Sequence, residues 1–346
     1  MKTHAIIPIF IPHAGCPHDC VFCSQRAITA RSAAPTAENA EAIILRNLTS
    51  IEANPNIREK EIAFYGGSFT GIPVEEQNAY LKLAKKYKDA GRISKIHLST
   101  RPDYINEKIL DNLKKHSVDI IELGVQSFDE KVLRKAARGH SAGAVYTGAG
   151  LIKEYGFTLG IQLMTGLPGD SYESCIFSAK ETVKLAPELA RIYPTVVIEG
   201  TALADMYRAE TYTPPDDQHT LYTVKEMYKI LTSAGINVIR IGLKSTDIIK
   251  NDEGAVVGGG YHPAFRQLVE SEIARDSLLQ QLELHGINTD SRCKVEFVSS
   301  PKSFSNMIGA NKKNKLYFAG RFPALSIKYS SDNMLNPGIY LVKIQP

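Results

Sequence analysis

The sequence has little excess charge, few cysteines and no long apolar run, and each shortage excludes a class of protein. Its 346 residues include 41 basic and 37 acidic side chains. The resulting formal charge of +4 is too small to indicate which kind of partner the protein binds. The five cysteines are odd in number and too few for a secreted disulfide framework, so we expect a reducing, cytoplasmic location. The N-terminus is apolar only from Ala5 to Pro12 and is interrupted by Pro8, so we expect neither a signal peptide nor a membrane span.

The composition is that of an ordinary globular protein. Apolar residues make up 43% of the chain and charged residues 23%, which excludes both disorder and a fibrous repeat. An α/β barrel commonly uses about 200 to 250 residues as one domain. The length therefore suits one barrel with an appendage of about 100 residues.

Short β-branched runs alternate with longer helical patterns, which is typical of parallel strands joined by crossover helices. The pattern predicts an α/β fold, an incomplete (β/α)6 barrel whose loops carry the site at the C-terminal ends of the strands. The expected strands are 5–10, 61–65, 95–99, 119–124, 158–163 and 191–198. The expected helices are 37–51, 74–90, 106–115, 129–137, 144–155 and 171–185.

After residue 212 the alternation weakens, which indicates the end of the barrel. A helix is expected at 216–234, a seventh strand or exit segment at 236–242, and a long helix at 264–284. We therefore predict a partial barrel over residues 1–245 and a C-terminal lobe over residues 246–346. The strands expected in this lobe are 294–298, 316–318, 324–329 and 339–344.

Cys16, Cys20 and Cys23 form a C-x3-C-x2-C triplet directly after the first expected strand. Structural cysteines seldom gather in this way, and three thiolates can hold an iron–sulfur cluster that keeps one iron open for chemistry. A zinc site completed by His13 or His18, or a set of redox thiols, is also compatible with the spacing.

A second motif, Gly66-Gly67-Ser68-Phe69, follows the second expected strand. Glycines there let the backbone approach a ligand, although a plain strand-to-helix turn gives the same pattern. Four further motifs follow in order along the chain. They are Ser99-Thr100-Arg101-Pro102-Asp103-Tyr104, Gly124-Val125-Gln126-Ser127-Phe128, Arg138-Gly139-His140 and Gly166-Leu167-Pro168-Gly169.

The triplet, with Phe22 before its last cysteine, resembles that of the radical S-adenosylmethionine (radical SAM) superfamily. Together the motifs resemble the radical half of the Elongator catalytic-subunit family, which modifies the tRNA wobble uridine, and more distantly oxygen-independent coproporphyrinogen oxidases. The resemblance implies a [4Fe–4S] cluster held by Cys16, Cys20 and Cys23. It also implies S-adenosylmethionine on the open iron, an external one-electron donor and a 5′-deoxyadenosyl radical.

The resemblance also implies a cofactor pocket, carried over position by position. Gly66 and Gly67 match the motif that binds the methionine amino group, whereas Gln126 and Arg138 match contacts to the methionine carboxylate and nearby groups. Two further cofactor positions differ from the family pattern: Ser99 stands where a ribose-binding glutamate is frequent, and Gln162 stands where the oxidases carry aspartate. The resemblance therefore leaves the nucleoside contacts to Thr100 and backbone groups. From the residues alone, Arg138 could instead pair with Glu130 across its helix.

Other reactive side chains have plainer explanations. His13, His18 and His140 are expected to be structural, and Cys175 and Cys293 to be buried free thiols. The tyrosines near the barrel exit fit core packing as well as base stacking. They are Tyr207, Tyr212, Tyr222 and Tyr228.

RNA, with tRNA favoured, is the substrate that the resemblance implies. Lys312, Lys313 and Lys315 lie in a polar stretch that we expect to be a hairpin loop able to touch phosphates. The roughly 100 residues after the barrel are too few for the Elongator acetyltransferase domain plus a connection.

Two alternatives remain at this stage. One is a small-molecule radical enzyme like the coproporphyrinogen oxidases, although Gln25 stands where those enzymes place a fourth cysteine. The other is a zinc-binding RNA module. The sequence gives no oligomeric state.

Overall fold

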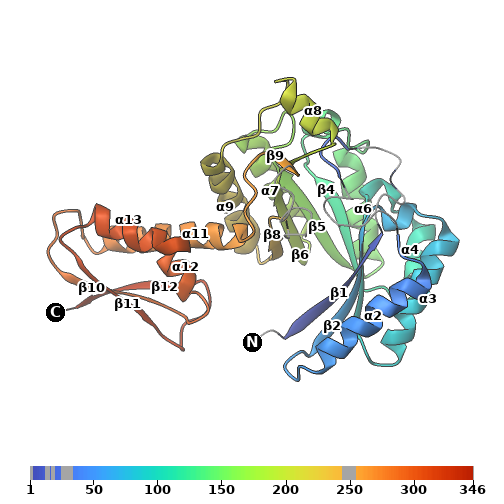
Figure 1. Cartoon of the computed structure of the whole chain (residues 1–346), viewed down its shortest axis with the longest axis horizontal. Helices are drawn as coiled ribbons and strands as arrows, with labels where there is room; N and C mark the ends of the chain where they lie inside the picture. Colours follow the sequence, from blue (N-terminus) through green and yellow to red (C-terminus); the bar gives the residue numbers. More distant parts are fainter. Residues whose placement is uncertain (1–2, 12–15, 17–19, 25–33, 244–254, 346) are drawn as a thin grey trace. The chain divides into compact units, whose positions relative to one another are not determined.

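The computed structural model describes residues 3–11, 16, 20–24, 34–243 and 255–345, and Figure 1 shows the ribbon. The chain divides into two compact units, Met1–Tyr261 and His262–Pro346. The boundary expected near residue 245 falls in residues 244–254, outside the described residues.

The first unit is built on a seven-stranded parallel sheet in the order β1-β2-β3-β4-β5-β6-β8. Its strands are β1 (His4–Ile11), β2 (Glu59–Gly66), β3 (Lys95–Thr100), β4 (Ile120–Gln126), β5 (Thr158–Thr165), β6 (Leu189–Pro194) and β8 (Asn237–Ile241). Each of the six expected strand segments contains a strand of this sheet, but the one expected at 191–198 ends at Pro194, and its last residues form a separate strand, β7 (Val197–Ile198), in another sheet. The segment 236–242, expected as a strand or an exit segment, contains the seventh strand. The sheet confirms the predicted partial α/β barrel.

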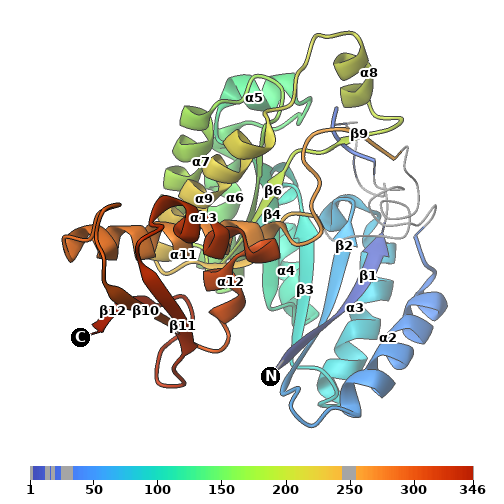
Figure 2. The ribbon, with the colours of Figure 1, turned by 60° about the vertical axis from the view of Figure 1, so that its left-hand side comes forward.

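Helices between the strands cover one face of the sheet (Figures 1 and 2). They are α2 (Ala37–Glu52), α3 (Val74–Asp89), α4 (Glu107–Lys115), α5 (Glu130–Lys135), α6 (Ala142–Glu154), α7 (Tyr172–Leu185) and α9 (Asp217–Ser233). Most begin at a short polar residue whose side chain accepts a backbone N–H of the first turn, as Ser141 and Ser171 do. These caps explain why the helix starts were readable from the sequence.

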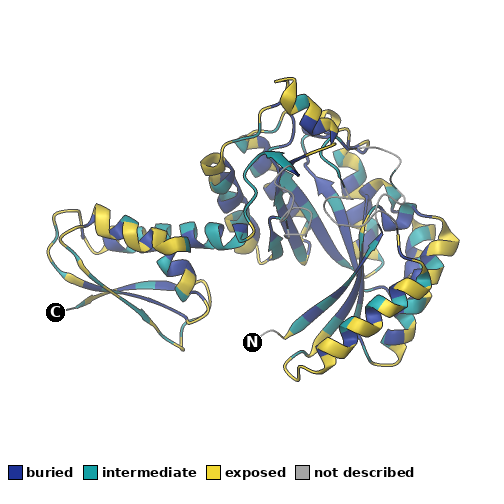
Figure 3. Ribbon diagram, in the orientation of Figure 1, coloured by how far each residue is buried: buried dark blue, intermediate teal, exposed yellow. Residues whose placement is uncertain are grey.

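The sheet's helix-facing side is the core of this unit. Its side chains, such as Ile62, Leu98, Ile121 and Ile192, are fully buried, and the strands are correspondingly dark in Figure 3. Burying each such side chain contributes about 1.5 to 3 kcal/mol. The opposite side, which we call the inner face, carries polar side chains instead.

Short elements follow the ends of the strands. The 3-10 turns η1 (Phe69–Gly71) and η2 (Pro102–Tyr104) follow β2 and β3. After β6 come β7 (Val197–Ile198) and α8 (Ala202–Arg208), and β7 pairs antiparallel with β9 (Val256–Gly258).

The second unit contains the predicted long helix, α11 (Phe265–Leu284), and a three-stranded sheet in the order β11-β10-β12. Its other elements are β10 (Lys294–Ser299), α12 (Phe304–Ile308), η3 (Ala310–Lys312), α13 (Lys313–Arg321), β11 (Ser326–Ser331) and β12 (Tyr340–Gln345). In the described part of the chain, no helix is both long and apolar enough to cross a membrane.

The strand expected at 316–318 is wrong, because these residues lie in α13. Phe318 is fully buried and packs edge-on against Phe297, with Phe322 one turn further along. Tertiary packing at helical spacing thus overrides the β-propensity of Tyr317 and Phe318. The hairpin loop expected around Lys312–Lys315 is likewise replaced by η3 and the first turn of α13.

Candidate functional site

The predicted site residues converge at the C-terminal ends of the strands, here called the mouth. Gly66 ends β2, Thr100 ends β3 and Gln126 ends β4. In a parallel sheet these ends share one edge, which is where α/β barrels place their sites. The mouth is therefore the candidate site.

Cys16 and Cys20 contact residues of the mouth. The Cys16 Sγ lies 3.5 Å from the Ser68 Oγ, and the Cys20 Sγ accepts a hydrogen bond from the Arg138 Nη1 at 3.2 Å. Residues 17–19 of the cysteine loop lie outside the described residues. Among the described residues, no group of three His, Cys, Asp or Glu side chains is placed to hold a metal ion. The role of the triplet as metal ligands stays a prediction.

The segment after Cys20 is anchored on both sides. The Val21 N–H donates to the Ala136 carbonyl at 3.2 Å, and the Leu203 N–H donates to the Val21 carbonyl at 2.7 Å. Val21 and Phe22 also pack against apolar clusters that include Val132 and Leu203. The end of α5 and the start of α8 thus fix the position of this half of the cysteine loop.

Arg138 links the cysteine loop to β4. It is buried and donates from Nη1 to Cys20, from Nη2 to the Gly124 carbonyl and from Nε to the His140 Nε2 at 3.3 Å. Glu130 instead accepts the Ala142 N–H, so the alternative pairing of Arg138 with Glu130 is not formed. The guanidinium therefore belongs to the mouth.

Gln126 and Gln162 meet beside Arg138. The Gln162 Nε2 donates to the Gln126 Oε1 at 3.1 Å, after a β-bulge that sets Gln126 at a left-handed φ of 71°. A Cβ added to Gly124 would lie 3.1 Å from the Gln126 Nε2, so the glycine leaves room for that amide. A strained backbone in a non-glycine residue at a strand end is a frequent mark of a functional site.

Arg101 is a mouth residue to which the sequence assigned no role. Its guanidinium holds Asp103 through two hydrogen bonds, Nε to Oδ1 at 3.0 Å and Nη2 to Oδ2 at 2.8 Å. Its Nη1 is buried without a hydrogen-bond partner among the described residues. A buried, unpartnered cationic nitrogen is costly, which points to a missing acceptor.

Charges at the mouth set the protonation of its neighbours. Burial raises the pKa of Asp103, but the hydrogen bond and charge of Arg101 outweigh it and leave the pKa below its ordinary value. Burial lowers the pKa of His140 to about 4, and repulsion from Arg138 adds to this, so the imidazole is neutral at pH 7. The mouth therefore presents fixed cations and a neutral histidine.

The glycine motif allows β1 to approach β2 closely. Gly66 has a φ of 118°, and a Cβ there would lie 2.6 Å from the Ile11 carbonyl oxygen. The Gly67 N–H donates to the same oxygen at 2.8 Å and is therefore not available to a ligand. The groups that this turn can offer to a ligand are its backbone carbonyls.

The mouth residues fit an iron–sulfur cluster with S-adenosylmethionine. Thiols of the Cys triplet are the donors that such clusters take, carbonyls of the glycine turn suit an ammonium group, and the buried Nη1 of Arg101 suits a carboxylate.

Ser99 and Thr100 are placed differently from the other predicted contacts. The Ser99 Oγ donates to the Glu122 Oε1 at 3.2 Å on the inner face. The buried Thr100 hydroxyl lies 2.6 Å from the Thr70 hydroxyl and so ties β3 to η1. Their role as nucleoside contacts stays a prediction.

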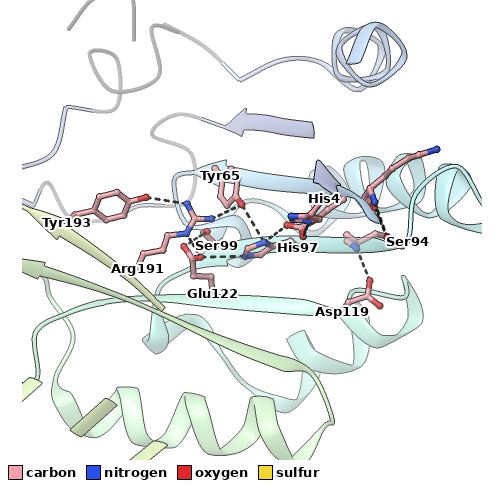
Figure 4. Close-up of polar contacts among 12 residues, drawn as sticks. His4, Tyr65, Ser94, His97, Ser99, Asp119, Glu122, Arg191 and Tyr193 are labelled. Atoms are coloured by element: carbon pink, nitrogen blue, oxygen red, sulfur yellow. Dashed lines mark hydrogen bonds and ion pairs between the residues drawn. The ribbon is translucent and has the colours of Figure 1, made fainter. Parts of the chain in front are cut away.

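A second polar cluster on the inner face, the inner polar network, was missed by the sequence analysis (Figure 4). It is formed by Glu61, Tyr65, His97, Ser99, Glu122, Arg191 and Tyr193. The Arg191 Nε donates to Glu122 at 2.7 Å, and the His97 Nδ1 lies 2.7 Å from Glu61. The sequence signal that could have revealed this network is the presence of charged residues at alternate positions of the expected strands, which face the inner side of the sheet.

The remaining predicted side chains are dispersed. His13 and His18 lie outside the described residues. Cys175 is buried and its thiol donates to Asp170, whereas Cys293 is half-buried in the second unit. Tyr212 is buried, with its hydroxyl on the Gly166 carbonyl, but Tyr222 is half exposed and stacks on Tyr172.

Two family models match the chain. The Radical SAM superfamily matches residues 10–181, and the Radical SAM C-terminal domain matches residues 187–275. These matches confirm the family resemblance predicted from the motifs.

Two curated relatives share part of the chain. The tRNA uridine(34) acetyltransferase of Methanocaldococcus infernus is 25% identical over 265 residues, which are 66% of this chain and 49% of that protein. Elongator complex protein 3 of Schizosaccharomyces pombe is 30% identical over 190 residues, or 53% of this chain and 34% of that protein. The chain thus spans half of these relatives or less.

Solved structures share the fold. The archaeal Elp3 of Methanocaldococcus infernus, lacking its first 46 residues, superposes with a TM-score of 0.63 at 21% identity, covering 83% of this chain and 64% of that one. Methylornithine synthase superposes with a TM-score of 0.51 at 16% identity and covers 83% of each chain.

Proposed function

This chain belongs to the radical SAM superfamily of enzymes, and from that premise we propose that it generates a 5′-deoxyadenosyl radical in order to modify RNA, with tRNA favoured. The observation that carries the radical chemistry is the contact of Cys20 with Arg138, which joins the cysteine loop to the Gln126 end of β4.

We propose that Cys16, Cys20 and Cys23 hold one [4Fe–4S] cluster. Gly66 and Gly67 then receive the amino group of S-adenosylmethionine, and Gln126 and Arg138 its carboxylate side. Ser99, Thr100 and Gln162 remain proposed cofactor contacts, with the nucleoside contacts left to Thr100 and backbone groups. The chemistry supplied by the bound group is one-electron cleavage of S-adenosylmethionine, with the electron from an external donor.

Three polar side chains of the mouth are buried. Gln126 is 4% exposed, Arg138 7% and Arg101 2%. Arg138 donates to Cys20, Gly124 and His140, the Gln126 Oε1 accepts from Gln162, and the Arg101 Nη1 has no partner among the described residues. Exclusion of water protects a reactive radical from side reactions.

The cofactor contacts give the first prediction. Gln126→Ala and Arg138→Ala should each keep the brown cluster and weaken S-adenosylmethionine binding by about 1.5 to 3 kcal/mol, because a charge-assisted contact is lost. That corresponds to a roughly tenfold to hundredfold higher Kd, measured by calorimetric titration of the reconstituted protein.

Arg134→Ala is the matched control. Arg134 is an exposed arginine of α5, the helix that ends shortly before Arg138. Its Kd should equal that of the wild type. Unchanged affinity in both Gln126→Ala and Arg138→Ala would show that the cofactor pocket lies elsewhere.

Support for RNA comes from the named function of the relatives and from the charge of the second unit. From His262 to Pro346 there are 11 lysines and arginines against seven aspartates and glutamates, so the net charge of +4 lies entirely in this unit. Lys312, Lys313 and Lys315 are all exposed at the start of α13. Such a surface suits a phosphate backbone.

The second prediction tests this surface. Replacing Lys312, Lys313 and Lys315 together by alanine should flatten the slope of log affinity for tRNA against log salt by roughly 2, since each phosphate contact releases about 0.7 to 0.9 counterions. Binding of the cofactor-loaded protein to tRNA is measured at several salt concentrations.

The control replaces Lys82, Lys85 and Lys86 of α3, where Lys85 and Lys86 already pair with Asp89 and Glu41. This variant removes the same charge and should keep the wild-type slope. Absence of tRNA binding at low salt would favour a small-molecule substrate. The modified nucleotide itself is sought by sequencing and mass spectrometry of RNA from a deletion strain.

A further inference from the structure

Arg138 is a buried cation that no carboxylate neutralises within the part of the chain that the structure describes. Asp103 is held by Arg101 at 2.8 Å, and Glu130 accepts the Ala142 N–H. A buried charge is costly unless an opposite charge and hydrogen bonds compensate it. A partner other than a carboxylate therefore has to account for the charge of Arg138.

The Cys20 sulfur is the acceptor of Arg138 that is able to carry a negative charge. Arg138 donates to it from Nη1 at 3.2 Å, and its other acceptors among the described residues are the Gly124 carbonyl and the His140 Nε2. His140 is neutral here, because its Nε2 accepts from Arg138 while its Nδ1 donates to the Ser141 carbonyl at 3.3 Å. A thiolate, the form of cysteine that binds metals, makes the contact with Cys20 a charge-assisted hydrogen bond.

The end of α5 holds both partners of this contact. The Arg138 N–H donates to the Leu133 carbonyl at 3.0 Å, so Arg138 belongs to the turn that closes the helix. The Ala136 carbonyl of the same turn accepts the N–H of Val21, the residue directly after Cys20, at 3.2 Å. Backbone hydrogen bonds to one helix end therefore place the guanidinium beside the sulfur.

The charges around Cys20 add up to one positive charge. Arg101 and Asp103 form a pair without net charge, His140 is neutral, and Arg138 remains. An electron that enters an iron–sulfur cluster adds one negative charge, so a neighbouring cation and a hydrogen bond to a ligand sulfur both favour the reduced form. Because Arg138 is buried, salt screens this interaction only weakly.

We propose that Arg138 is a positioning residue for the redox step: its guanidinium on the Cys20 sulfur raises the reduction potential of the cluster and so allows a weaker donor to reduce it. The inference rests on the proposed function and deepens it, since it concerns the external one-electron donor. One electron passes from that donor to the cluster, and the guanidinium keeps its proton. A guanidinium has five N–H groups, of which three are engaged here, so Arg138 can also contact the cofactor carboxylate.

The test measures the reduction potential of the reconstituted protein without S-adenosylmethionine, by electron paramagnetic resonance at a series of poised potentials. Arg138→Gln should lower the equilibrium constant for reduction about tenfold, which is a fall of about 59 mV for a one-electron couple. Arg138→Lys should retain most of the wild-type potential, because it keeps the charge. A purely structural role predicts instead that both variants behave alike, since neither side chain reproduces the planar fork of arginine.

Arg134→Gln is the matched control for this measurement. It removes one positive charge from an exposed position of α5, where solvent screens it, and should keep the wild-type potential. Iron content and visible absorbance are recorded for every variant, so that loss of the cluster is not mistaken for a change in potential.

Two results would overturn the inference and leave the radical SAM assignment standing. One is a wild-type potential in Arg138→Gln. The other is equal behaviour of Arg138→Gln and Arg138→Lys, whether as a shared shift or as a shared loss of the cluster. Loss of the cluster in Arg138→Gln alone would support a role of the charge. A wild-type protein that takes up no iron–sulfur cluster would overturn the proposed function and this inference with it.

Discussion

Replacing any one of Cys16, Cys20 or Cys23 by alanine is expected to abolish cleavage of S-adenosylmethionine. Each thiolate of the triplet is proposed as one bond to iron, and a cluster that lacks a protein ligand is lost or cannot hold its open iron in place. The measurement combines iron content, the visible absorbance of the anaerobically reconstituted protein and the yield of 5′-deoxyadenosine after reduction.

Cys293→Ala supplies the matched control, since Cys293 is a half-buried thiol in the second unit, remote in sequence from the triplet. It should retain the iron content and the yield of the wild type, as should Cys175→Ala. A Cys20→Ala protein that forms 5′-deoxyadenosine at the normal rate would refute the cluster assignment. Colourless protein with bound zinc after reconstitution would instead favour the zinc module.

Most of the barrel was predictable because its local signals agree. Apolar runs of strand length alternate with capped amphipathic helices, so α4 and α7 begin and end within one residue of their expected positions. The sequence could not distinguish a strand from a buried helix at 316–318, where three apolar residues fit either period. Only the contacts of Phe318 with Phe297 and Phe322 decide it.

The site was predictable where motifs follow strand ends, and less so where side chains cross the sheet. Gln126, Gln162 and Arg138 were identified from the family resemblance, and the structure brings them together. The contact between Arg191 and Glu122 joins residues 69 positions apart, on strands separated by β5. Such a pair depends on strand order, which composition and periodicity do not give.

Breaking the inner polar network should have the largest effect on stability. Glu122 is 2% exposed and binds Arg191 at 2.7 Å. Glu122→Leu leaves this guanidinium buried without its counter-ion, so we expect a loss of about 3 to 5 kcal/mol in the free energy of unfolding. Urea unfolding followed by far-ultraviolet circular dichroism measures the loss. Lys95→Ala, which removes an exposed ion pair with Glu59, should change it little.

The double variant Glu122→Leu with Arg191→Met tests the cause of that loss. Removing both charges also removes the unpaired ion, so most of the lost free energy should return. A single variant as stable as the wild type would show that Arg191 finds another partner on the inner face. A double variant no more stable than Glu122→Leu alone would show that the loss does not come from the unpaired guanidinium.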